Sequence, residues 1–309
     1  MNINDFINAN FSKIQYIDNI SKNVNIYLLD ERKYLVKKMD KSFDLRACSE
    51  KKKYIDFLYQ NGIKVGRVLI IFSDGKNVYE FQEYVENFFP INKFCMSQVV
   101  ALAKFHYISS LYKEEYQIAK VLPADTIVCG VHLDKLLIGF EEKYYTYPIK
   151  SLTDKTSGEK RVEKLYNIYT KVYNEFKRLY NINDCIIHND LTSKNMLSNG
   201  FASYAFVDFD FSIKSSVYVD LVDLYLTREY SMYDYINIFY SKRKEIEEVI
   251  KIYNENNPVI KLDFRGFVLM AVLKLYSYAF YLYLPVKRLD DEIIDVLIIV
   301  GELALKTSL

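Results

Sequence analysis

Short segments of alternating hydrophobic and polar residues in the first part of the chain predict a small antiparallel sheet. The β-rich runs cover 22–29, 33–38, 67–72 and 77–82. Asp30-Glu31-Arg32 joins the first pair and Ser73-Asp74-Gly75-Lys76 joins the second, and such residues favour tight turns. Between the two hairpins, helical spacing over 45–59 follows Asp44, a candidate N-cap, and stops before Gly62. The predicted order is strand, strand, helix, strand, strand.

From residue 87 onward the apolar positions recur at helical spacing. One predicted helix face carries Val99, Leu102, Ala103 and His106. A second helix is predicted over 161–180, and much of 232–305 is helical as well. On this face His106 is more typical of a core histidine with satisfied hydrogen bonds than of a catalyst.

One short β interruption lies inside the helical part. The runs 195–197 and 204–207 surround Ser198-Asn199-Gly200, whose Asn-Gly pair favours a tight hairpin. We therefore predict an α+β protein with an N-terminal lobe, 1–86, built from a small sheet and one helix. The predicted C-terminal lobe, 87–309, is larger and mainly helical.

Composition and charge exclude several classes of protein. The 309 residues are half hydrophobic and about a quarter charged, which is typical of a folded enzyme. Because 41 Lys and Arg face 40 Asp and Glu, the chain lacks the basic surplus of a nucleic-acid-binding protein. Four separate cysteines without a CxxC pair, and three histidines, give no zinc-site spacing and favour a reducing, cytoplasmic location.

One apolar stretch, 266–284, raises the question of a membrane span. Lys274 interrupts it in the middle, and tyrosines crowd one half, so we expect a buried helix of a large helical lobe instead. The start of the chain is polar and shows no secretory signal. We expect a cytoplasmic protein with no membrane span.

The candidate chemistry lies on the loop that follows 185–187 and on the predicted hairpin. Asp190 and Asn195 are five residues apart on that loop, and Asp208 follows the second hairpin strand, so the fold-back brings Asp208 close to Asn195. An amide oxygen and a carboxylate are hard ligands suited to Mg²⁺ carrying nucleotide phosphates. Asp190 is left free to take a proton from an attacking hydroxyl. These parts suffice for phosphoryl transfer.

The segment His188-Asn189-Asp190-Leu191 with Asn195, followed by Val207-Asp208-Phe209-Asp210, resembles the catalytic core of the aminoglycoside phosphotransferase and choline kinase superfamily. The Asp-Phe-Asp ending and Val217-Tyr218-Val219-Asp220-Leu221 are similar to its spore-coat-associated bacterial members. The resemblance implies a two-lobed protein-kinase-like fold. It also implies that Asp190 is the catalytic base, that Asn195 and Asp208 bind the metal, and that Asp220 braces the catalytic loop.

The N-terminal lobe should then supply the groups that hold the nucleotide. Lys37 closes the apolar run Tyr34-Leu35-Val36, as a kinase lysine for the α- and β-phosphates does, whereas Lys38 points to the opposite face of the strand. Its partner acid should lie on the following helix. Glu50 is the acid available there, although a glutamate beside Lys51-Lys52-Lys53 could also be simply solvated. We predict a Lys37–Glu50 pair.

The phosphate-covering loop departs from the kinase pattern. Its turn, Ser21-Lys22-Asn23-Val24-Asn25, contains no glycine, but Ser21 and Asn25 offer turn conformations and side-chain donors to a phosphate. Adenine normally binds backbone groups of the strand that links the lobes. By position these are the backbone groups of Glu83 and Val85.

Together these features indicate an ATP- and Mg²⁺-dependent kinase that acts on a small-molecule hydroxyl acceptor. The alternative is a catalytically weak or inactive protein of the same fold with a binding or structural, coat-associated role. The short separation of Asp208 from Asp220 disfavours a protein kinase, because it leaves no room for an activation segment. The sequence does not distinguish ATP from GTP, nor does it indicate the oligomeric state.

The resemblance implies that helices after Asp220 build the acceptor pocket, and acids and aromatic residues are interleaved in the part of the chain after Asp208. The acids are Asp220, Asp223, Glu229 and Asp234, and the rings are Tyr225, Tyr230, Tyr233 and Tyr235. Such groups bind an ammonium ion by Coulomb attraction and cation–π contact, so they suggest a cationic amino alcohol, aminocyclitol or amino sugar. The alternative is that Asp220 braces the loop, Asp223 caps a helix and the tyrosines fill the core.

Overall fold

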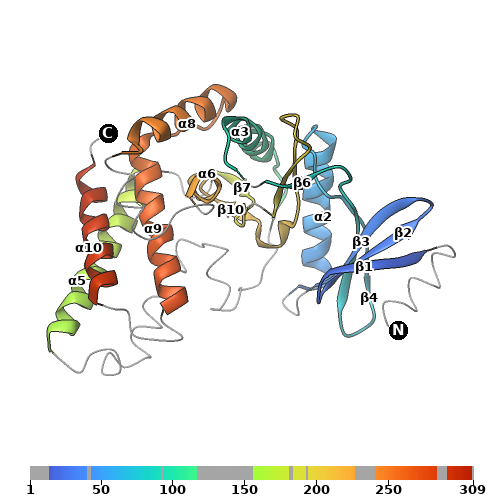
Figure 1. Cartoon of the computed structure of the whole chain (residues 1–309), viewed down its shortest axis with the longest axis horizontal. Helices are drawn as coiled ribbons and strands as arrows, with labels where there is room; N and C mark the ends of the chain where they lie inside the picture. The colour runs from blue at the N-terminus through green and yellow to red at the C-terminus, as the bar shows by residue number, and fades with distance from the viewer. Residues whose placement is uncertain are drawn as a thin grey trace.

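The computed structural model confirms a mixed α/β protein with an N-terminal antiparallel sheet and a helical C-terminal part (Figure 1). The structure describes residues 14–39, 43–91, 93–116, 156–180, 184–192, 194–226, 241–283 and 291–307. The sheet has five strands in the order β1-β2-β3-β5-β4. The strands are β1 (Gln15–Ser21), β2 (Val24–Leu29), β3 (Arg32–Lys38), β4 (Val68–Ser73) and β5 (Val78–Glu83).

The four predicted strands are confirmed as β2 to β5, and every neighbouring pair in the sheet is antiparallel. Strand β1 was not predicted. All seven of its residues are exposed, so it lacks the alternation by which a half-buried strand is recognised. The β3–β5 register places Lys37 directly opposite Glu80, and this pairing turns both side chains to the same face of the sheet.

The predicted N-terminal helix is α2 (Leu45–Gln60), and it stands between the sheet and the helical part of the molecule (Figure 1). Asp44 caps it as predicted, since its carboxylate accepts a hydrogen bond from the Ala47 N–H at 2.8 Å. Gly62 follows the helix with a φ of 81°, a conformation that favours glycine. Helix α2 therefore begins and ends where its capping residues predict.

In the C-terminal part, helix α9 packs against most of the other helices. The helices are α3 (Met96–Ser110), α5 (Thr156–Leu179), α6 (Tyr218–Leu226), α8 (Arg243–Asn256), α9 (Phe264–Tyr283) and α10 (Asp291–Lys306). Helices α5, α6, α8 and α10 all contact α9. The predicted helical region 232–305 is thus divided into several helices within its described part, and the run from Phe267 to Tyr276 is buried throughout.

The apolar stretch at α9 is a core helix, as predicted. It approaches α6 closely, because a Cβ added at Gly266 would overlap the ring of Tyr218. The Tyr218 hydroxyl accepts a hydrogen bond from the Asp263 N–H at 2.9 Å, just before α9 begins. Among the helices in the described ranges, none is both long and apolar enough to cross a membrane.

Two small sheets border the segments that carry Asp190, Asn195 and Asp208. Strand β7 (Cys185–Ile187) pairs with β10 (Ile213–Ser215), and β6 (Phe89–Pro90), β8 (Met196–Ser198) and β9 (Tyr204–Phe206) form the other sheet. The predicted hairpin is confirmed as β8–β9, with Met196 opposite Phe206. A short 3₁₀ helix, η3 (Phe209–Phe211), follows β9.

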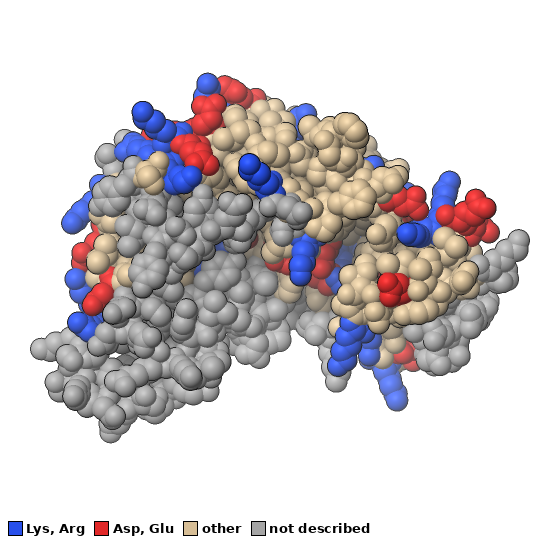
Figure 2. Space-filling view, viewed as in Figure 1, with Lys and Arg blue, Asp and Glu red and all other residues tan. Residues whose placement is uncertain are grey.

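Charged side chains of both signs are interspersed over the face seen in Figure 2, where the coloured residues form no large patch of one sign. This distribution matches the nearly balanced composition.

Candidate active site

The loop between β7 and β8 carries Asp190, and a buried carboxylate on α6 supports it. Asp220 accepts hydrogen bonds from the backbone N–H groups of His188 at 2.8 Å and Asn189 at 2.7 Å. His106 on α3 lies 3.0 Å from the same carboxylate through Nε2, and its Nδ1 lies 2.9 Å from the Tyr253 hydroxyl. Burial alone would raise the pKa of Asp220, but His106 and the backbone N–H groups lower it. Asp220 is therefore ionised and braces the loop.

The two histidines near the loop have structural surroundings. His106 is fully buried with both ring nitrogens engaged, as expected for a core histidine. His188 Nε2 lies 2.8 Å from the Val207 carbonyl oxygen, which only accepts, so this nitrogen carries the proton. Burial lowers the pKa of His188, and the ring stays neutral. It ties the loop to the strand that leads to Asp208.

The hairpin brings Asn195 beside Asp208, as its spacing predicts. The Val207 N–H donates to the Asn195 carbonyl at 3.0 Å, so Asp208 is the next residue along. The Asn195 side chain donates from Nδ2 to both the backbone oxygen and Oδ2 of Asp190, each at 2.8 Å. Both of these bonds use the amide nitrogen, which turns the amide oxygen away from Asp190. Asn195 thus joins Asp190 to the predicted metal site.

Asp208 is the accessible carboxylate of this site. Its backbone is left-handed, with φ 63° and ψ 64°, and its side chain is 41% exposed. Oδ1 contacts Lys37 Nζ at 2.5 Å. A carboxylate and an amide oxygen are ligands of the kind that suit Mg²⁺, so the side chains of Asp208 and Asn195 fit the metal that the motif implies.

Burial and neighbouring charges perturb Asp190. Desolvation raises its pKa to about 7, and the carboxylates of Asp223 and Asp208 contribute in the same direction. Lys274 and the hydrogen bond from Asn195 oppose this shift. A carboxylate with a pKa near neutrality suits a general base, because it accepts a proton readily and returns it readily.

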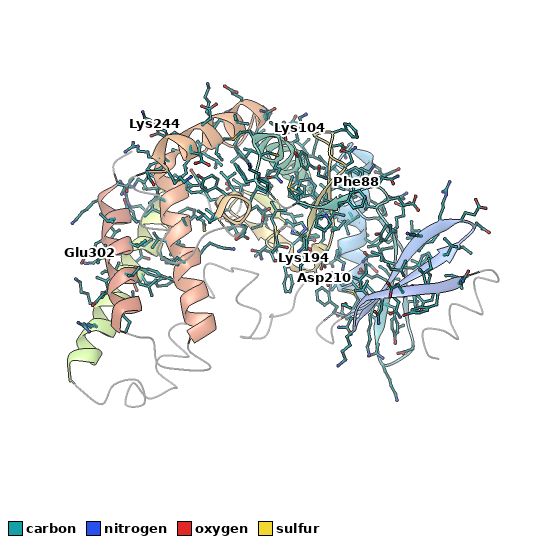
Figure 3. The ribbon with its side chains drawn as sticks, in the orientation of Figure 1. Phe88, Lys104, Lys194, Asp210, Lys244 and Glu302 are labelled. Carbon is teal, nitrogen blue, oxygen red and sulfur yellow. The ribbon has the colours of Figure 1, made fainter. Side chains whose placement is uncertain are left out.

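The partner of Lys37 differs from the predicted one. Lys37 pairs with Asp208 and, at 2.8 Å, with Asp210, whereas Glu50 accepts from Arg46 one turn earlier on α2. The reason is the rotation of α2, which turns Lys51 rather than Glu50 toward the sheet. Figure 3 shows Asp210 between the sheet with α2 and the helical part of the molecule.

Lys51, Glu80 and Asp210 form a buried group that the motif analysis did not identify. Lys51 Nζ lies 2.8 Å from Glu80 and 2.6 Å from Asp210, with side-chain exposures of 1% for Lys51 and 0% for Glu80. The carboxylates raise the pKa of Lys51 despite its burial, and the two lysines lower that of Asp210. A signal exists in the sequence, because Lys51 lies on the apolar helix face formed by Ala47, Cys48, Tyr54, Ile55 and Leu58.

The residues predicted to bind the nucleotide lie in the N-terminal sheet or directly after it. Ser21 ends β1 and Asn25 lies in β2, on either side of the short turn at Lys22 and Asn23. Glu83 is the last residue of β5, and Val85 lies two residues later in the segment that the sequence predicted as the linker. A Cβ added at Gly66 would lie 3.5 Å from Val207 and 3.7 Å from the Glu83 carbonyl, so this linker runs beside the strand that leads to Asp208.

The acids predicted for the acceptor are partly engaged within the protein. Asp220 braces the loop, and Asp223 forms a buried pair with Lys274 at 2.6 Å. Asp223 lies within α6, so the alternative prediction that it caps a helix is wrong. Tyr225 is buried against the rings of Phe94 and Phe267. The remaining candidates, Glu229, Asp234, Tyr230, Tyr233 and Tyr235, lie outside the described residues.

Comparison with known proteins adds a family and a set of similar folds. The model of the ecdysteroid kinase-like family matches residues 69–256, more than half of the chain. No protein of curated function matches the sequence.

Solved structures of several small-molecule kinases are similar to this chain at low identity. A microcompartment-associated aminopropanol kinase is 11% identical with a TM-score of 0.57, over 98% of this chain and 94% of its own. An ethanolamine kinase from Plasmodium vivax is 14% identical with a TM-score of 0.56, over 97% and 83%. A spectinomycin phosphotransferase in complex with ADP and spectinomycin is 13% identical with a TM-score of 0.51, over 98% and 96%. The predicted kinase-like fold is confirmed.

The raised pKa of Asp190 generates a testable prediction. In the metal-free protein, a carbon-13 NMR titration assigned with Asp190→Asn should show the carboxyl ionising near pH 7, well above the ordinary value of about 3.9. Proton acceptance is therefore lost as pH falls through this range. Asp223→Asn removes a neighbouring negative charge and should move the transition to lower pH. A transition near pH 4 in the unmodified protein would contradict the buried environment described for Asp190.

Proposed function

The chain belongs to the ecdysteroid kinase-like family, and from this premise we propose that it transfers the γ-phosphoryl group of ATP to a hydroxyl group of a small molecule. One observation carries the proposal. Asp190, Asn195 and Asp208 converge through the loop and the hairpin, and Lys37 reaches Asp208 from the sheet.

Each residue has a role that its surroundings support. Asp190 orients the acceptor hydroxyl and takes its proton, and its raised pKa matches that task. Asn195 and Asp208 hold Mg²⁺, which when bound neutralises phosphate charge. Lys37 holds the α- and β-phosphates, whereas Glu50, for which the sequence predicted a catalytic role as the partner of Lys37, pairs with Arg46 on its own helix. Transfer is direct, because the motif contains no second nucleophile.

Binding of the nucleotide uses the sheet and the linker. Ser21 and Asn25 flank the turn that covers the phosphates, and the backbone groups of Glu83 and Val85 bind adenine. The spectinomycin phosphotransferase in complex with ADP supports nucleotide use by this fold. In the absence of glycine, the turn relies on Ser and Asn side chains as phosphate donors.

We assign the acceptor to the cationic amino alcohols or aminoglycoside-like compounds. The aminopropanol kinase, the ethanolamine kinase and the spectinomycin phosphotransferase all act on hydroxyl compounds that carry amines, which supports this class. Of the acids in the described part of the chain, Asp223 is shared with Lys274, so its charge is already offset. The proposal therefore depends most on Glu229 and Asp234.

Removal of the base tests the proposed chemistry. Asp190→Ala should lower phosphoryl transfer about 10²–10⁴-fold, because a positioned general base contributes about that much. The measurement is ADP release from ATP and Mg²⁺ over a panel of hydroxyl acceptors, against a reaction without acceptor. Asp18→Ala, which removes an exposed carboxylate on β1, is the control and should leave the rate unchanged. A folded Asp190→Ala variant with normal turnover would exclude the assignment of the base, and nucleotide binding without turnover for every acceptor would favour a binding role.

Metal dependence is a second expected outcome. ATP with Mg²⁺ should raise the melting temperature, because ligands that bind only the native state stabilise it, and ATP with EDTA should not. Asp208→Asn should weaken the effect, since the variant loses the carboxylate charge at the predicted metal site. Equal stabilisation by ATP with and without EDTA would count against Asn195 and Asp208 as metal ligands.

The charge of the acceptor can be tested separately. Cationic amino alcohols should have a higher kcat/KM than neutral alcohols of similar size, and the difference should shrink between low and moderate salt as charges are screened. A preference for neutral sugars, or no dependence on salt, would overturn the cationic class and leave the kinase assignment intact.

A further inference from the structure

Lys37 on β3 belongs to a series of ion pairs with alternating charges, which joins the sheet and α2 to the segment after β9. The successive ion pairs are Glu80–Lys51 at 2.8 Å, Lys51–Asp210 at 2.6 Å, Asp210–Lys37 at 2.8 Å and Lys37–Asp208 at 2.5 Å. Asp210 lies between the two lysines and contacts Lys51 through Oδ1 and Lys37 through Oδ2. Asp210 is thus the central residue of this series of ion pairs.

The charge that the helix contributes to this series of ion pairs is opposite in sign to the one in protein kinases. In those enzymes, the strand lysine is held by a glutamate on the helix that follows. Here the inward-facing charge on α2 is the cation Lys51, and its acid, Glu80, lies on β5 directly opposite Lys37. Lys37 takes both of its carboxylate contacts from the segment after β9. A different residue must therefore do the work of the helix glutamate.

Burial makes the Lys51 contacts specific. Lys51 and Glu80 are almost completely excluded from solvent, so Lys51 is placed to act on a bound ligand only through the residues that it contacts. If either carboxylate turned away, a charge would be left buried with less compensation, which is strongly unfavourable. Glu80 is also held on its other oxygen by Gln82 Nε2 at 2.7 Å. The position of Asp210 is therefore determined from α2 and β5.

This series of ion pairs has one carboxylate more than it has ammonium groups, so a further cation could bind to it. Three carboxylates face two ammonium groups, so the group carries one net negative charge. Asp208 is the exposed end at 41%, whereas the Asp210 side chain is 14% exposed. When Asp208 serves a metal ion, Asp210 is the carboxylate that remains to hold Lys37.

We infer that Lys51 is a positioning residue for nucleotide binding: it fixes Asp210, and Asp210 in turn fixes Lys37 toward the phosphates. The inference rests on the proposed function, since Lys37 needs a nucleotide on which to act. It assigns to a buried lysine on α2, acting through an aspartate, the task that a helix glutamate has in protein kinases.

A paired substitution tests the inference without leaving a buried charge. Lys51→Met together with Glu80→Gln removes both ends of the inner pair while keeping their size. Calorimetry with a non-hydrolysable ATP analogue and Mg²⁺ should show about tenfold weaker binding in this variant, with an unchanged KM for the acceptor. Lys51→Arg keeps the charge and should bind the analogue within about threefold of the unmodified protein.

A double-mutant cycle separates positioning from a general structural role. If Lys51 acts through Asp210, the paired substitution should weaken binding much less in an Asp210→Asn background, because contacting residues are not additive. Lys52→Met is the matched control on the same helix, where Lys52 pairs with Asp56 at 2.7 Å, and it should leave nucleotide affinity unchanged. Additive losses, or an equal loss with Lys52→Met, would show that the pair only stabilises α2 and would overturn the inference.

The two levels of the proposal fail differently. If the unmodified protein binds the analogue with Mg²⁺ and the Lys51→Met, Glu80→Gln variant binds it equally well, the inference is wrong and the kinase assignment stands. If the unmodified protein does not bind the analogue at all, both are wrong.

Discussion

The arrangement of the site depends on one buried carboxylate, Asp220. A buried ionised group must have its hydrogen bonds satisfied, and Asp220 does this with two backbone N–H groups of the loop and with His106. The loop therefore has the position that α6 and α3 give it. Because α6 also packs against α9, the place of Asp190 is determined by the core of the helical part rather than by the loop itself.

The sheet side is organised by a second set of buried charges, with a different mechanical consequence. In protein kinases, the helix after the strand lysine acts on that lysine directly. In this protein, a shift of α2 would move Lys51 and thus act first on Asp210, one residue beyond Phe209 and two beyond Asp208. Helix position would then be coupled to the segment that carries Asp208 as well as to β3.

Features of this fold and site are predictable from the sequence where the residues that form them are close together in the chain. The hairpins, the capping of α2 by Asp44 and the approach of Asn195 to Asp208 depend on short spacings, and the structure confirms them. The contact of Lys51 with Asp210 joins residues 159 positions apart, so no local pattern reveals it. Strand β1 is wholly exposed and leaves no alternation. The boundary at residues 86 and 87 and the roles of the site residues remain predictions.

The left-handed backbone at two positions of the site changes how an inactive relative should be recognised. Asn189 and Asp208 have φ values of 65° and 63°, a region that Asn, Asp and Gly adopt more readily than other residues. Folding alone therefore favours these residue types, even where phosphoryl transfer has been lost. Lys37 and Asp190 are not under this backbone constraint, so their presence is the stronger evidence that a chain of this kind has retained catalysis during its evolution.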